Sequence, residues 1–335
     1  MFYRFLELYN DKTVVVTGGA GFIGSAVARK LYRDTTARIS VIDKFGYGSS
    51  SASLAFPCDD RRMRIYVNDL VDTHTICELI NKIQPDIILH LAAESHVDRS
   101  IEEPRAFIES NVMGTFSILE AARKLADKKP VRFHHVSTDE VFGSLDDDGA
   151  FDEDSVYNPR SPYSASKAAS DHLAQAWMHT YGLHVTMTNC SNNFGPFQHE
   201  DKFIPTIIQR AINNKPIPLY GTGNNVRNWI YVDEHVNGLL MVAAQAESGK
   251  TYCIGGDAEF DNKSLAKLVC RLIDDELPER APHDRLIQLV LDRPGHDYRY
   301  SIDSTRIKND LGWALQDSFL EKLRHTVKWY IKRWA

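Results

Sequence analysis

Tyr163 and Lys167 are side chains whose types and spacing suit redox chemistry. They stand four residues apart, so on a helix they share one face, and Pro162 just before them is typical of a helix start. A nearby ammonium favours the phenolate and lowers the pKa of the phenol, so the Tyr can accept a hydroxyl proton while hydride leaves the same carbon. The pair indicates oxidation or reduction at an alcohol carbon, although surface pairs have the same spacing.

A second group, Thr138-Asp139-Glu140, directly follows a strand expected over 133–137. The carboxyl ends of strands are where a doubly wound sheet presents its ligands. A simple dehydrogenase needs only a hydroxyl here, whereas two acidic groups provide further proton chemistry. One carboxylate would act as a base beside a ketone, and a protonated partner would deliver a proton to a departing hydroxyl. The alternative is a solvated acidic turn.

Three glycines near the start of the chain predict a dinucleotide-binding turn. Gly18, Gly21 and Gly24 follow a β-branched run at 13–17 and open a helix expected over 22–33. In such a turn the first glycine permits the bend, the second lets the backbone approach a pyrophosphate, and the third lets the helix pack on the strand. The free N–H groups of the helix N-terminus then face the anion.

Two acidic residues at later strand ends extend this prediction. Asp43 lies about 20 residues beyond the glycine turn, where its carboxylate would accept hydrogen bonds from ribose hydroxyls. It would repel a 2′-phosphate and so favours NAD over NADP, although the adjacent Lys44 weakens that inference. Asp69 follows the third strand and is placed either to meet the adenine edge or to cap a helix.

Strands that alternate with helices must position these groups. We expect strands over residues 13–17, 39–42, 63–67, 86–91, 131–136 and 185–189. This alternation predicts an α/β fold with a doubly wound parallel sheet of the Rossmann type. From Ser191 onward Gly, Asn and Pro cluster, which indicates a smaller lobe. We therefore divide the chain into an NAD-binding domain, 1–190, and a second lobe, 191–335, that covers the carboxyl ends of the strands, with segments near 229–254 returning to the first domain.

Composition excludes several other classes of protein. The 335 residues carry a net charge of −6 and no Lys/Arg run, which argues against a nucleic-acid partner. The five cysteines are an odd number without a CxxC pair, so neither a disulfide framework nor a zinc site is expected. No apolar run has the length of about 18 residues that a membrane helix needs. The first 11 residues carry charges where a signal peptide would be apolar, so we expect a cytoplasmic protein. No histidine spacing resembles a metal motif.

Six stretches resemble the nucleotide-sugar short-chain dehydrogenases, and most closely the 4,6-dehydratases that act on dTDP-glucose. They cover the chain from near Thr13 to near its end and are GGAGFIGS (18–25), HLAAESHVDRS (90–100), FHHVSTDEVFG (133–143), SPYSASKAASDHL (161–173), TNCSNNFGPF (188–197) and DRPGHDYRY (292–300). The resemblance implies NAD as cofactor and a net lyase reaction.

The resemblance also implies a role for each group in three steps. Tyr163, assisted by Thr138 and Lys167, would deprotonate the glucose C4 hydroxyl as hydride passes to NAD. Glu140 would then remove the C5 proton while Asp139 protonates the departing C6 hydroxyl. Return of the hydride to C6 would give a 4-keto-6-deoxy sugar.

Further residues are implied around the two ligands. Around NAD, besides the glycines, Tyr163 and Lys167, these are Phe22, Ile23, Asp43, Lys44, Asp69, Leu70, Leu91, Ala92, Ala93, Glu94 and Asn193. Around the nucleotide sugar they are Ser95, Thr138, Asn192, Lys202, Phe203, Pro218, Leu219, Tyr220, Arg227, Asn262, Arg293 and His296. Arg227 and Arg293 suit a diphosphate, because guanidinium matches its oxygens in pairs, although each alone resembles a surface arginine.

The sequence departs from the family pattern at three places. Phe142 and Phe194 stand where the family usually has Tyr, which removes a hydroxyl at each position but no proposed catalytic group. The stretch 45–51 (FGYGSSS) differs from the usual loop after Asp43, so the contacts to the adenosine half of NAD and the identity of the nucleotide remain open.

The resemblance implies a homodimer through a four-helix bundle formed by the segments 104–126 and 163–181 of each subunit. Phe107, Ile108, Val112 and Phe116 add apolar surface on the first segment, although packing against the sheet must use part of it.

Other functions on the same scaffold remain as alternatives. A UDP-sugar 4-epimerase needs no acid–base pair, a UDP-glucuronate decarboxylase has no use for Asp139, and a non-enzymatic NAD-binding regulator would be free to lose Tyr163 or Lys167. Among dehydratase substrates, thymidine is the favoured base, with uridine and cytidine as alternatives.

Overall fold

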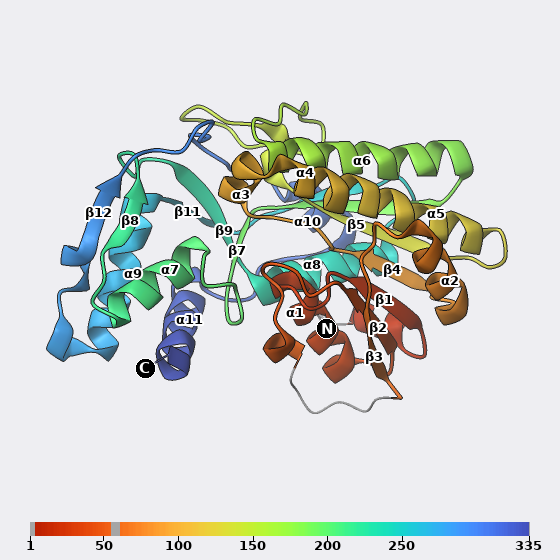
Figure 1. Ribbon diagram of the computed structural model, residues 1–335, viewed down its shortest axis with the longest axis horizontal. Coiled ribbons are helices and arrows are strands. Elements are labelled where there is room, and N and C mark those ends of the chain that lie inside the picture. Colours follow the sequence, from red (N-terminus) through yellow and green to blue (C-terminus); the bar gives the residue numbers. More distant parts are fainter. Residues whose placement is uncertain (1–3, 55–60, 335) are drawn as a thin grey trace.

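The computed structural model describes residues 4–54 and 61–334 and shows a central parallel sheet with helices on both faces (Figure 1). Seven strands in the order β10-β6-β5-β4-β1-β2-β3 form this sheet, and every neighbouring pair is parallel. Their bounds are Thr13–Thr17 (β1), Arg38–Asp43 (β2), Met63–Val67 (β3), Ile87–His90 (β4), Arg132–Thr138 (β5), His184–Cys190 (β6) and Thr251–Ile254 (β10). The predicted α/β fold of the Rossmann type is confirmed.

Alternating side chains of the strands build two cores, one on each face of the sheet. Val14 and Val16 of β1 face one core, whereas Val15 faces the other, as the period of two in a strand requires. The first core is covered by α1 (Phe22–Asp34), α8 (Val232–Gln245) and the short helix Arg4–Tyr9. The second is covered by α2 (Thr73–Ile83), α5 (Gly114–Ala126) and α6 (Pro162–Tyr181).

The strand order reverses between β1 and β4, because the chain goes from β1 outward to β3 and then crosses to β4 on the other side. Such a reversal opens a crevice at the carboxyl ends of the two strands, and ligands of doubly wound proteins bind there. The glycine turn after β1 and the segment 91–96 after β4 border this crevice. The topology therefore places the predicted cofactor turn at the point where a ligand site is expected.

The segment 104–126, predicted as one helix, is interrupted. It consists of α4 (Pro104–Phe107), a π-helical segment (Ile108–Met113) and α5. Asn111 in the π-helical segment is buried, and its amide is hydrogen-bonded to the backbone of Glu94 at 2.7 and 3.0 Å and to Ser166 at 2.8 Å. An inserted residue of this kind re-aims one side chain without ending the helix.

The remaining elements form a second body beside the sheet (Figure 1). Its core lies between α7 (Phe203–Ile212), α9 (Asn262–Glu276) and α11 (Phe319–Trp334). This body also contains the three-stranded sheet of β11 (Ala258–Asp261), β9 (Val226–Tyr231) and β7 (Asn192–Phe194) and the pair β8 (Ile217–Tyr220) and β12 (Ile287–Val290). Two short helices belong instead to the first body: α3 (Val97–Glu102) packs on α4 and α6, and α10 (Thr305–Leu311) packs on α8 and β10. The proposed domain boundary at 190/191 stays a prediction; strand β10 and helix α8 pack with the central sheet.

The structure also bears on the cysteines and on membrane-spanning helices. Cys77, Cys190, Cys253 and Cys270 are free thiols, and Cys58 lies outside the described residues. Within residues 4–54 and 61–334, no helix has the length and apolar character needed to cross a membrane.

Candidate active site

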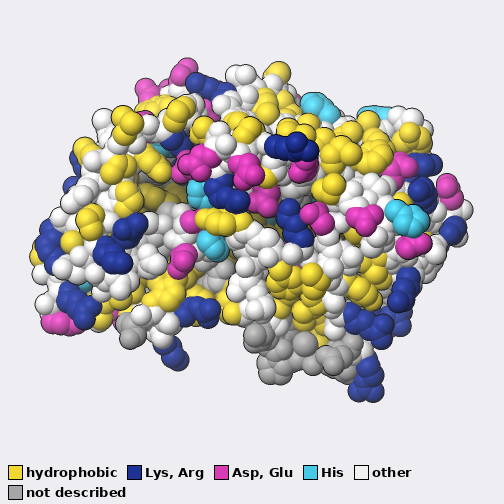
Figure 2. Space-filling model, in the orientation of Figure 1, with side chains coloured by type: hydrophobic (Ala, Val, Ile, Leu, Met, Phe, Trp, Pro, Cys, Tyr) yellow, Lys and Arg dark blue, Asp and Glu magenta, His cyan; other side chains and the backbone are white. Residues whose placement is uncertain are grey.

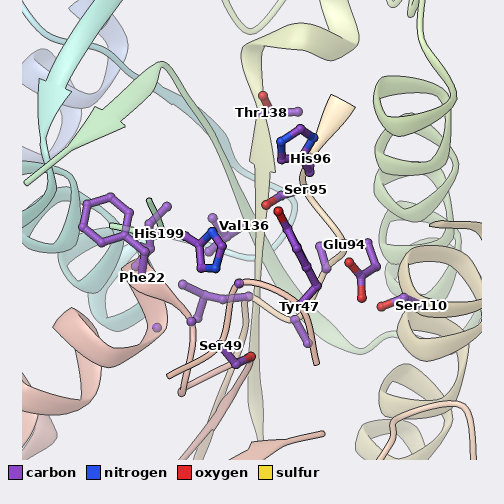
Figure 3. Close-up of a pocket in the computed structure, with 18 of the residues that line it drawn as sticks. Phe22, Tyr47, Ser49, Glu94, Ser95, His96, Ser110, Val136, Thr138 and His199 are labelled. Atoms are coloured by element: carbon purple, nitrogen blue, oxygen red, sulfur yellow. The ribbon is translucent and has the colours of Figure 1, made fainter. Parts of the chain in front are cut away.

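A cavity of about 300 Å³ lies at the carboxyl ends of the central strands, between the sheet and the second body. On the face shown in Figure 2, acidic, basic and histidine side chains gather where these two parts meet. Figure 3 shows Tyr47, Ser95, His96 and His199 directed toward one another across this cavity. All three predicted groups, the glycine turn, Thr138-Asp139-Glu140 and Tyr163 with Lys167, line it together.

The glycine turn has the backbone geometry that lets a phosphate group of a ligand approach closely. Gly18 has a φ of +68°, and a Cβ there would lie 2.7 Å from the backbone of Ala92. A Cβ at Gly24 would overlap the carbonyl of Gly18, so the third glycine lets α1 pack against the turn. Gly21 is the N-cap of α1 and provides no side-chain hydrogen bond to it. The first N–H groups of α1 are thus left for an anionic ligand.

Asp43 and the residues beside it order the loop after β2. The buried Asp43 carboxylate accepts hydrogen bonds from the N–H of Ala20 at 2.9 Å, the N–H of Phe45 at 2.8 Å and the Ser49 hydroxyl at 3.1 Å. It therefore fixes the glycine turn to the loop 45–51 and also lines the cavity. A carboxylate has acceptor positions for about four donors, so one remains for a ribose hydroxyl.

Asp69 is a cavity residue and not a helix cap. The N-cap of α2 is Asp72, whose side chain accepts a hydrogen bond from the N–H of Thr75. Asp69 instead lines the cavity beside Lys44, whose ammonium is 3.8 Å from the Asp69 carboxylate and 3.5 Å from that of Glu94. The other residues predicted around NAD also line the cavity: Phe22, Ile23, Leu70, Leu91, Ala92, Ala93, Glu94 and Asn193.

Thr138 is the last residue of β5 and begins the short helix Asp139–Phe142, whose first turn contains Asp139 and Glu140. The Thr138 hydroxyl accepts a hydrogen bond from the N–H of Glu140 at 3.3 Å and acts to lower the pKa of the Tyr163 phenol. Tyr163 lies in the first turn of α6, which Pro162 and a capping box from Ser161 to Ser164 fix in place. Strand β5 and helix α6 thus bring the acidic pair to the phenol.

The Asp139 carboxyl is built to hold a proton near neutral pH. Its side chain is buried, and burial together with the charge of Glu140 raises its pKa from 3.8 to about 8. One of its oxygens accepts a hydrogen bond from Thr138 at 3.3 Å, and the other has no partner among the described residues. A carboxyl that lines a cavity and is protonated at neutral pH can donate a proton to a ligand.

The neighbouring Glu140 has a different environment. Burial raises its pKa, but the charges of Arg293, Arg227 and Lys202 act in the opposite direction, in that order. Positive charge around one carboxylate favours its ionised form, which is the form a base requires. The two adjacent acidic groups therefore differ in electrostatic surroundings, and the difference suits Asp139 as an acid and Glu140 as a base.

The predicted lowering of the Tyr163 pKa by Lys167 is not found. Burial raises the pKa of the phenol well above its usual value, with Glu140 adding to the effect, and the Thr138 hydroxyl only partly opposes it. Lys167 donates instead to the carbonyl of Val136 at 2.9 Å. The expected pairing fails because the ammonium has a backbone acceptor on β5 and the phenol has acidic neighbours.

Predicted nucleotide-sugar residues fall into two groups. Ser95, Thr138, Asn192 and Lys202 line the cavity, and the Lys202 ammonium donates to the carbonyl of Ser95 at 2.9 Å. The others do not line it: Phe203 begins α7, Pro218, Leu219 and Tyr220 belong to β8, Arg227 to β9, Asn262 begins α9, and Arg293 and His296 lie in the segment after β12.

Arg227 and Arg293 nevertheless act on the acidic pair. Arg227 is buried, stacks on the ring of Tyr300 at 4.3 Å and donates to the carbonyls of Val226, Asp297 and Tyr298. Arg293 lies 3.4 Å from the Asp98 carboxylate, and its buried Nε has no partner within the described residues. Both charges reach Glu140. Arg227 is therefore not a surface arginine and Arg293 is partly buried, while the binding of a diphosphate by either stays a prediction.

Sequence reasoning missed a bridge across the cavity. The Tyr47 hydroxyl donates to the Asp201 carboxylate at 2.7 Å, and the same carboxylate contacts His96 at 3.1 Å and His199 at 2.9 Å. Arg99 lies over the Tyr47 ring at 4.0 Å. His96 belongs to the stretch HLAAESHVDRS that carried the resemblance, which was a usable signal, whereas Tyr47 belongs to the loop that departed from it.

Among residues 4–54 and 61–334, no three His, Cys, Asp or Glu side chains are grouped so as to hold a metal ion. The geometry instead assembles a dinucleotide turn, a phenol, an acidic pair with opposed electrostatics and buried arginines. These are the parts of an enzyme that transfers hydride and eliminates water from a phosphorylated ligand.

Residues 15–326 match the protein family described as GDP-mannose 4,6 dehydratase. A probable dTDP-glucose 4,6-dehydratase of Sinorhizobium fredii is 47% identical over 95% of this chain and 93% of its own length. The dTDP-glucose 4,6-dehydratase of Salmonella typhimurium is 44% identical over 95% and 92%. This chain belongs to the dTDP-glucose 4,6-dehydratase family. The predicted family is therefore confirmed.

Solved structures agree with this membership. The dTDP-glucose 4,6-dehydratase DesIV of Streptomyces venezuelae, solved with NAD bound, has a TM-score of 0.89 and 41% identity, covering 96% of this chain and 97% of that one. A UDP-glucose 4-epimerase of Thermus thermophilus, also solved with NAD, has a TM-score of 0.85 but only 25% identity over 95% and 99%. The fold is thus common to both activities, and sequence identity favours the dehydratases.

Proposed function

We propose that this protein is an NAD-dependent lyase that converts dTDP-glucose to dTDP-4-keto-6-deoxyglucose. The observation that carries the proposal is the buried Asp139 carboxyl, with a pKa of about 8, beside Glu140 and within the same cavity as Tyr163. An enzyme that only oxidises or epimerises an alcohol carbon has no use for a carboxyl held protonated at neutral pH. Family membership supports the same reaction.

NAD fits the first part of the cavity. The glycine turn would hold its pyrophosphate at the N-terminus of α1, and Asp43 and Asp69 would face its adenosine half. When bound, NAD supplies the hydride acceptor for C4 and the hydride donor for C6. The side chains of this chain must therefore handle protons and orientation.

Proton transfers follow from the geometry of the three groups. In its phenolate form Tyr163, which lines the cavity with Thr138, accepts the proton of the C4 hydroxyl. The ketone at C4 makes the C5 hydrogen acidic, and Glu140, surrounded by three positive charges, removes it. Asp139 gives its proton to the C6 hydroxyl, so that water leaves and the C5–C6 double bond forms. The C5 proton is then returned as C6 receives hydride, which completes the 4-keto-6-deoxy sugar.

The nucleotide end would occupy the region between the acidic pair and the second body. Arg227 and Arg293 would pair with the diphosphate oxygens, because both guanidinium groups act on Glu140 and one of them has a buried free N–H. The predicted contacts from Phe203, Pro218, Leu219, Tyr220, Asn262 and His296 belong to this proposal.

The test is incubation of the purified protein with dTDP-, UDP- and CDP-glucose and detection of a 4-keto-6-deoxy product from each. We expect product from dTDP-glucose at the highest kcat/KM. Higher kcat/KM with UDP- or CDP-glucose would reassign the base, and no product from any of the three would refute the dehydratase function.

We also propose a cytoplasmic homodimer. The segments 104–126 and 163–181 leave Ile108, Met113 and Tyr181 exposed at 48%, 43% and 52% on their outer surfaces. Phe107 is not available for a partner because it is buried against the Tyr163 ring, and Phe116 packs on Trp177 within the subunit. Sizing in solution tests the dimer, and Ile108→Glu is expected to weaken it.

A further inference from the structure

Behind the active site, the buried Asp171 carboxylate is the centre of a hydrogen-bond network between β5 and α6. One oxygen faces the Nε2 of His135 at 2.8 Å. The other accepts hydrogen bonds from the Ser137 hydroxyl at 2.6 Å and the Tyr157 hydroxyl at 3.0 Å. Both Asp171 and His135 are fully buried. Because a carboxylate only accepts, His135 carries its proton on Nε2.

This carboxylate lies one helical turn beyond Lys167. Residues at i and i+4 are neighbours on a helix face, and both side chains reach the same segment of β5. The Lys167 ammonium donates to the carbonyl of Val136, while Asp171 binds the side chains of His135 and Ser137 on either side of that residue. Strand β5 therefore holds the ammonium and the carboxylate in one buried layer.

Other titratable groups around Lys167 do not supply negative charge at neutral pH. Burial lowers the pKa of His135 on β5 and of His90 on β4, so both rings are neutral. Burial raises the pKa of Cys190 on β6 to about 12 and that of Tyr163 on α6 above its usual value. Burial also disfavours the charged form of Lys167, and Asp171 is the foremost group that opposes this effect.

We propose that Asp171 is a positioning residue for the dehydratase reaction: held by His135, Ser137 and Tyr157, it is the buried counter-charge that keeps Lys167 protonated and fixed against β5. An ammonium at this place is what the cavity needs to orient hydroxyl groups of a ligand beside Tyr163, since a neutral amine on a flexible stem is a weaker and less directed donor. The proposed role of Asp171 concerns the pH range above neutrality, where Lys167 would lose its proton.

The deciding experiment is the pH profile of kcat for Asp171→Asn. Without the carboxylate charge, Lys167 loses its proton at lower pH, so the alkaline limb of the profile should move down by about one unit or more. At a pH above both limbs this corresponds to a loss of kcat of about tenfold, with KM for the nucleotide sugar little changed. An unshifted alkaline limb in a folded Asp171→Asn protein would overturn the proposal.

Two matched variants separate charge from stability. Ser137→Ala and Tyr157→Phe each remove one hydrogen bond to the same carboxylate but leave its charge in place. Both should lower the melting temperature and leave the alkaline limb where it is in the unmodified protein. If either moved the limb as far as Asp171→Asn does, a structural role would replace the electrostatic one.

A second measurement needs no substrate and remains decisive if Asp171→Asn does not fold. In Lys167→Met the Asp171 carboxylate is left without its counter-charge, which costs most where the carboxylate is ionised. The melting temperature should therefore fall further, relative to the unmodified protein, at pH 8 than at pH 5.5. Equal losses at the two pH values would contradict the coupling. The role in catalysis rests on the proposed function, but this stability test can fail or succeed whatever the substrate is.

Discussion

Replacing Asp139 by Asn should make the protein more stable and much less active. The change keeps the size of the side chain and removes only its ability to donate or lose a proton. Asp139 is buried, accepts one hydrogen bond from Thr138 and has its pKa raised from 3.8 to about 8. An acidic group whose pKa is raised on folding opposes folding wherever the unfolded chain would be ionised.

The sign and size of the stability effect follow from these two pKa values. Between pH 3.8 and about pH 8 the folded protein holds a proton that the unfolded chain has lost, so stability decreases as pH rises through this window. Each unit corresponds to about 1.4 kcal/mol, and Asn is indifferent to pH. The advantage of Asp139→Asn in free energy of unfolding should therefore grow by roughly 3–4 kcal/mol between pH 5 and pH 8.

Activity should change in the opposite direction, because the variant has no proton to give to the C6 hydroxyl. General acid catalysis contributes about 10²–10⁴-fold, and turnover should fall by a factor in that range. Oxidation at C4 uses Tyr163 and should persist. The near-ultraviolet absorbance of reduced nicotinamide should therefore accumulate in a single turnover instead of rising and disappearing.

Urea unfolding at pH 5, 6.5 and 8 measures the first effect, and rapid-mixing absorbance measures the second. Asp148→Asn, an exposed acidic residue of the loop after β5, is the matched control and should change neither. A constant stability difference between Asp139→Asn and the unmodified protein across this pH range would refute the raised pKa. Normal turnover by Asp139→Asn would refute its role as the acid.

Three further outcomes test other parts of the site. Gly18→Ala should bind NAD more weakly and lose about 1–2 kcal/mol or more of stability in urea unfolding, because a φ of +68° and a Cβ 2.7 Å from Ala92 both disfavour a side chain there. Unaltered NAD titration would contradict the assignment of the turn. Tyr47→Phe removes the 2.7 Å hydrogen bond to Asp201 across the cavity and should speed NAD release in stopped-flow measurements, with a stability cost of about 1 kcal/mol. An unchanged release rate would mean that this hydrogen bond does not retain NAD. Arg227→Lys should raise KM for the nucleotide sugar about tenfold or more in steady-state assays, because lysine cannot provide the planar guanidinium that stacks on Tyr300. An unchanged KM would show that Arg227 does not bind the diphosphate.

The central sheet was predictable because its strands carry local signals. The run at 13–17 ends at a glycine, and the observed β1 has those bounds. The predicted strand over 131–136 was placed too early, since β5 runs from Arg132 to Thr138. Its last two residues are polar, and their burial comes from α6 and β6, which a local pattern cannot include. The π-helical interruption at 108–113 was equally invisible, because it depends on Asn111 meeting the backbone of Glu94.

Site residues near one another in sequence were found more readily than contacts between distant segments. The glycine turn, Tyr163 and Lys167 are recognisable from spacing alone. The bridge from Tyr47 to Asp201 joins residues 154 positions apart, and the bond from His135 to Asp171 spans 36. Neither partner of these pairs is unusual in its own stretch, so only the folded arrangement reveals that they meet.

The difference between Asp139 and Glu140 shows why local sequence could not assign the acid and the base. The two residues are adjacent and both are acidic, so composition and spacing treat them alike. Burial raises the pKa of both, but their charged neighbours differ: Arg293, Arg227 and Lys202, all from the second body of the molecule, oppose the effect on Glu140, whereas at Asp139 the charge of Glu140 adds to burial and Arg227 opposes it. The arginines that would hold the diphosphate thereby also favour an ionised base. Loss of their positive charge should weaken proton abstraction at C5 as well as substrate binding, so kcat and KM should change together.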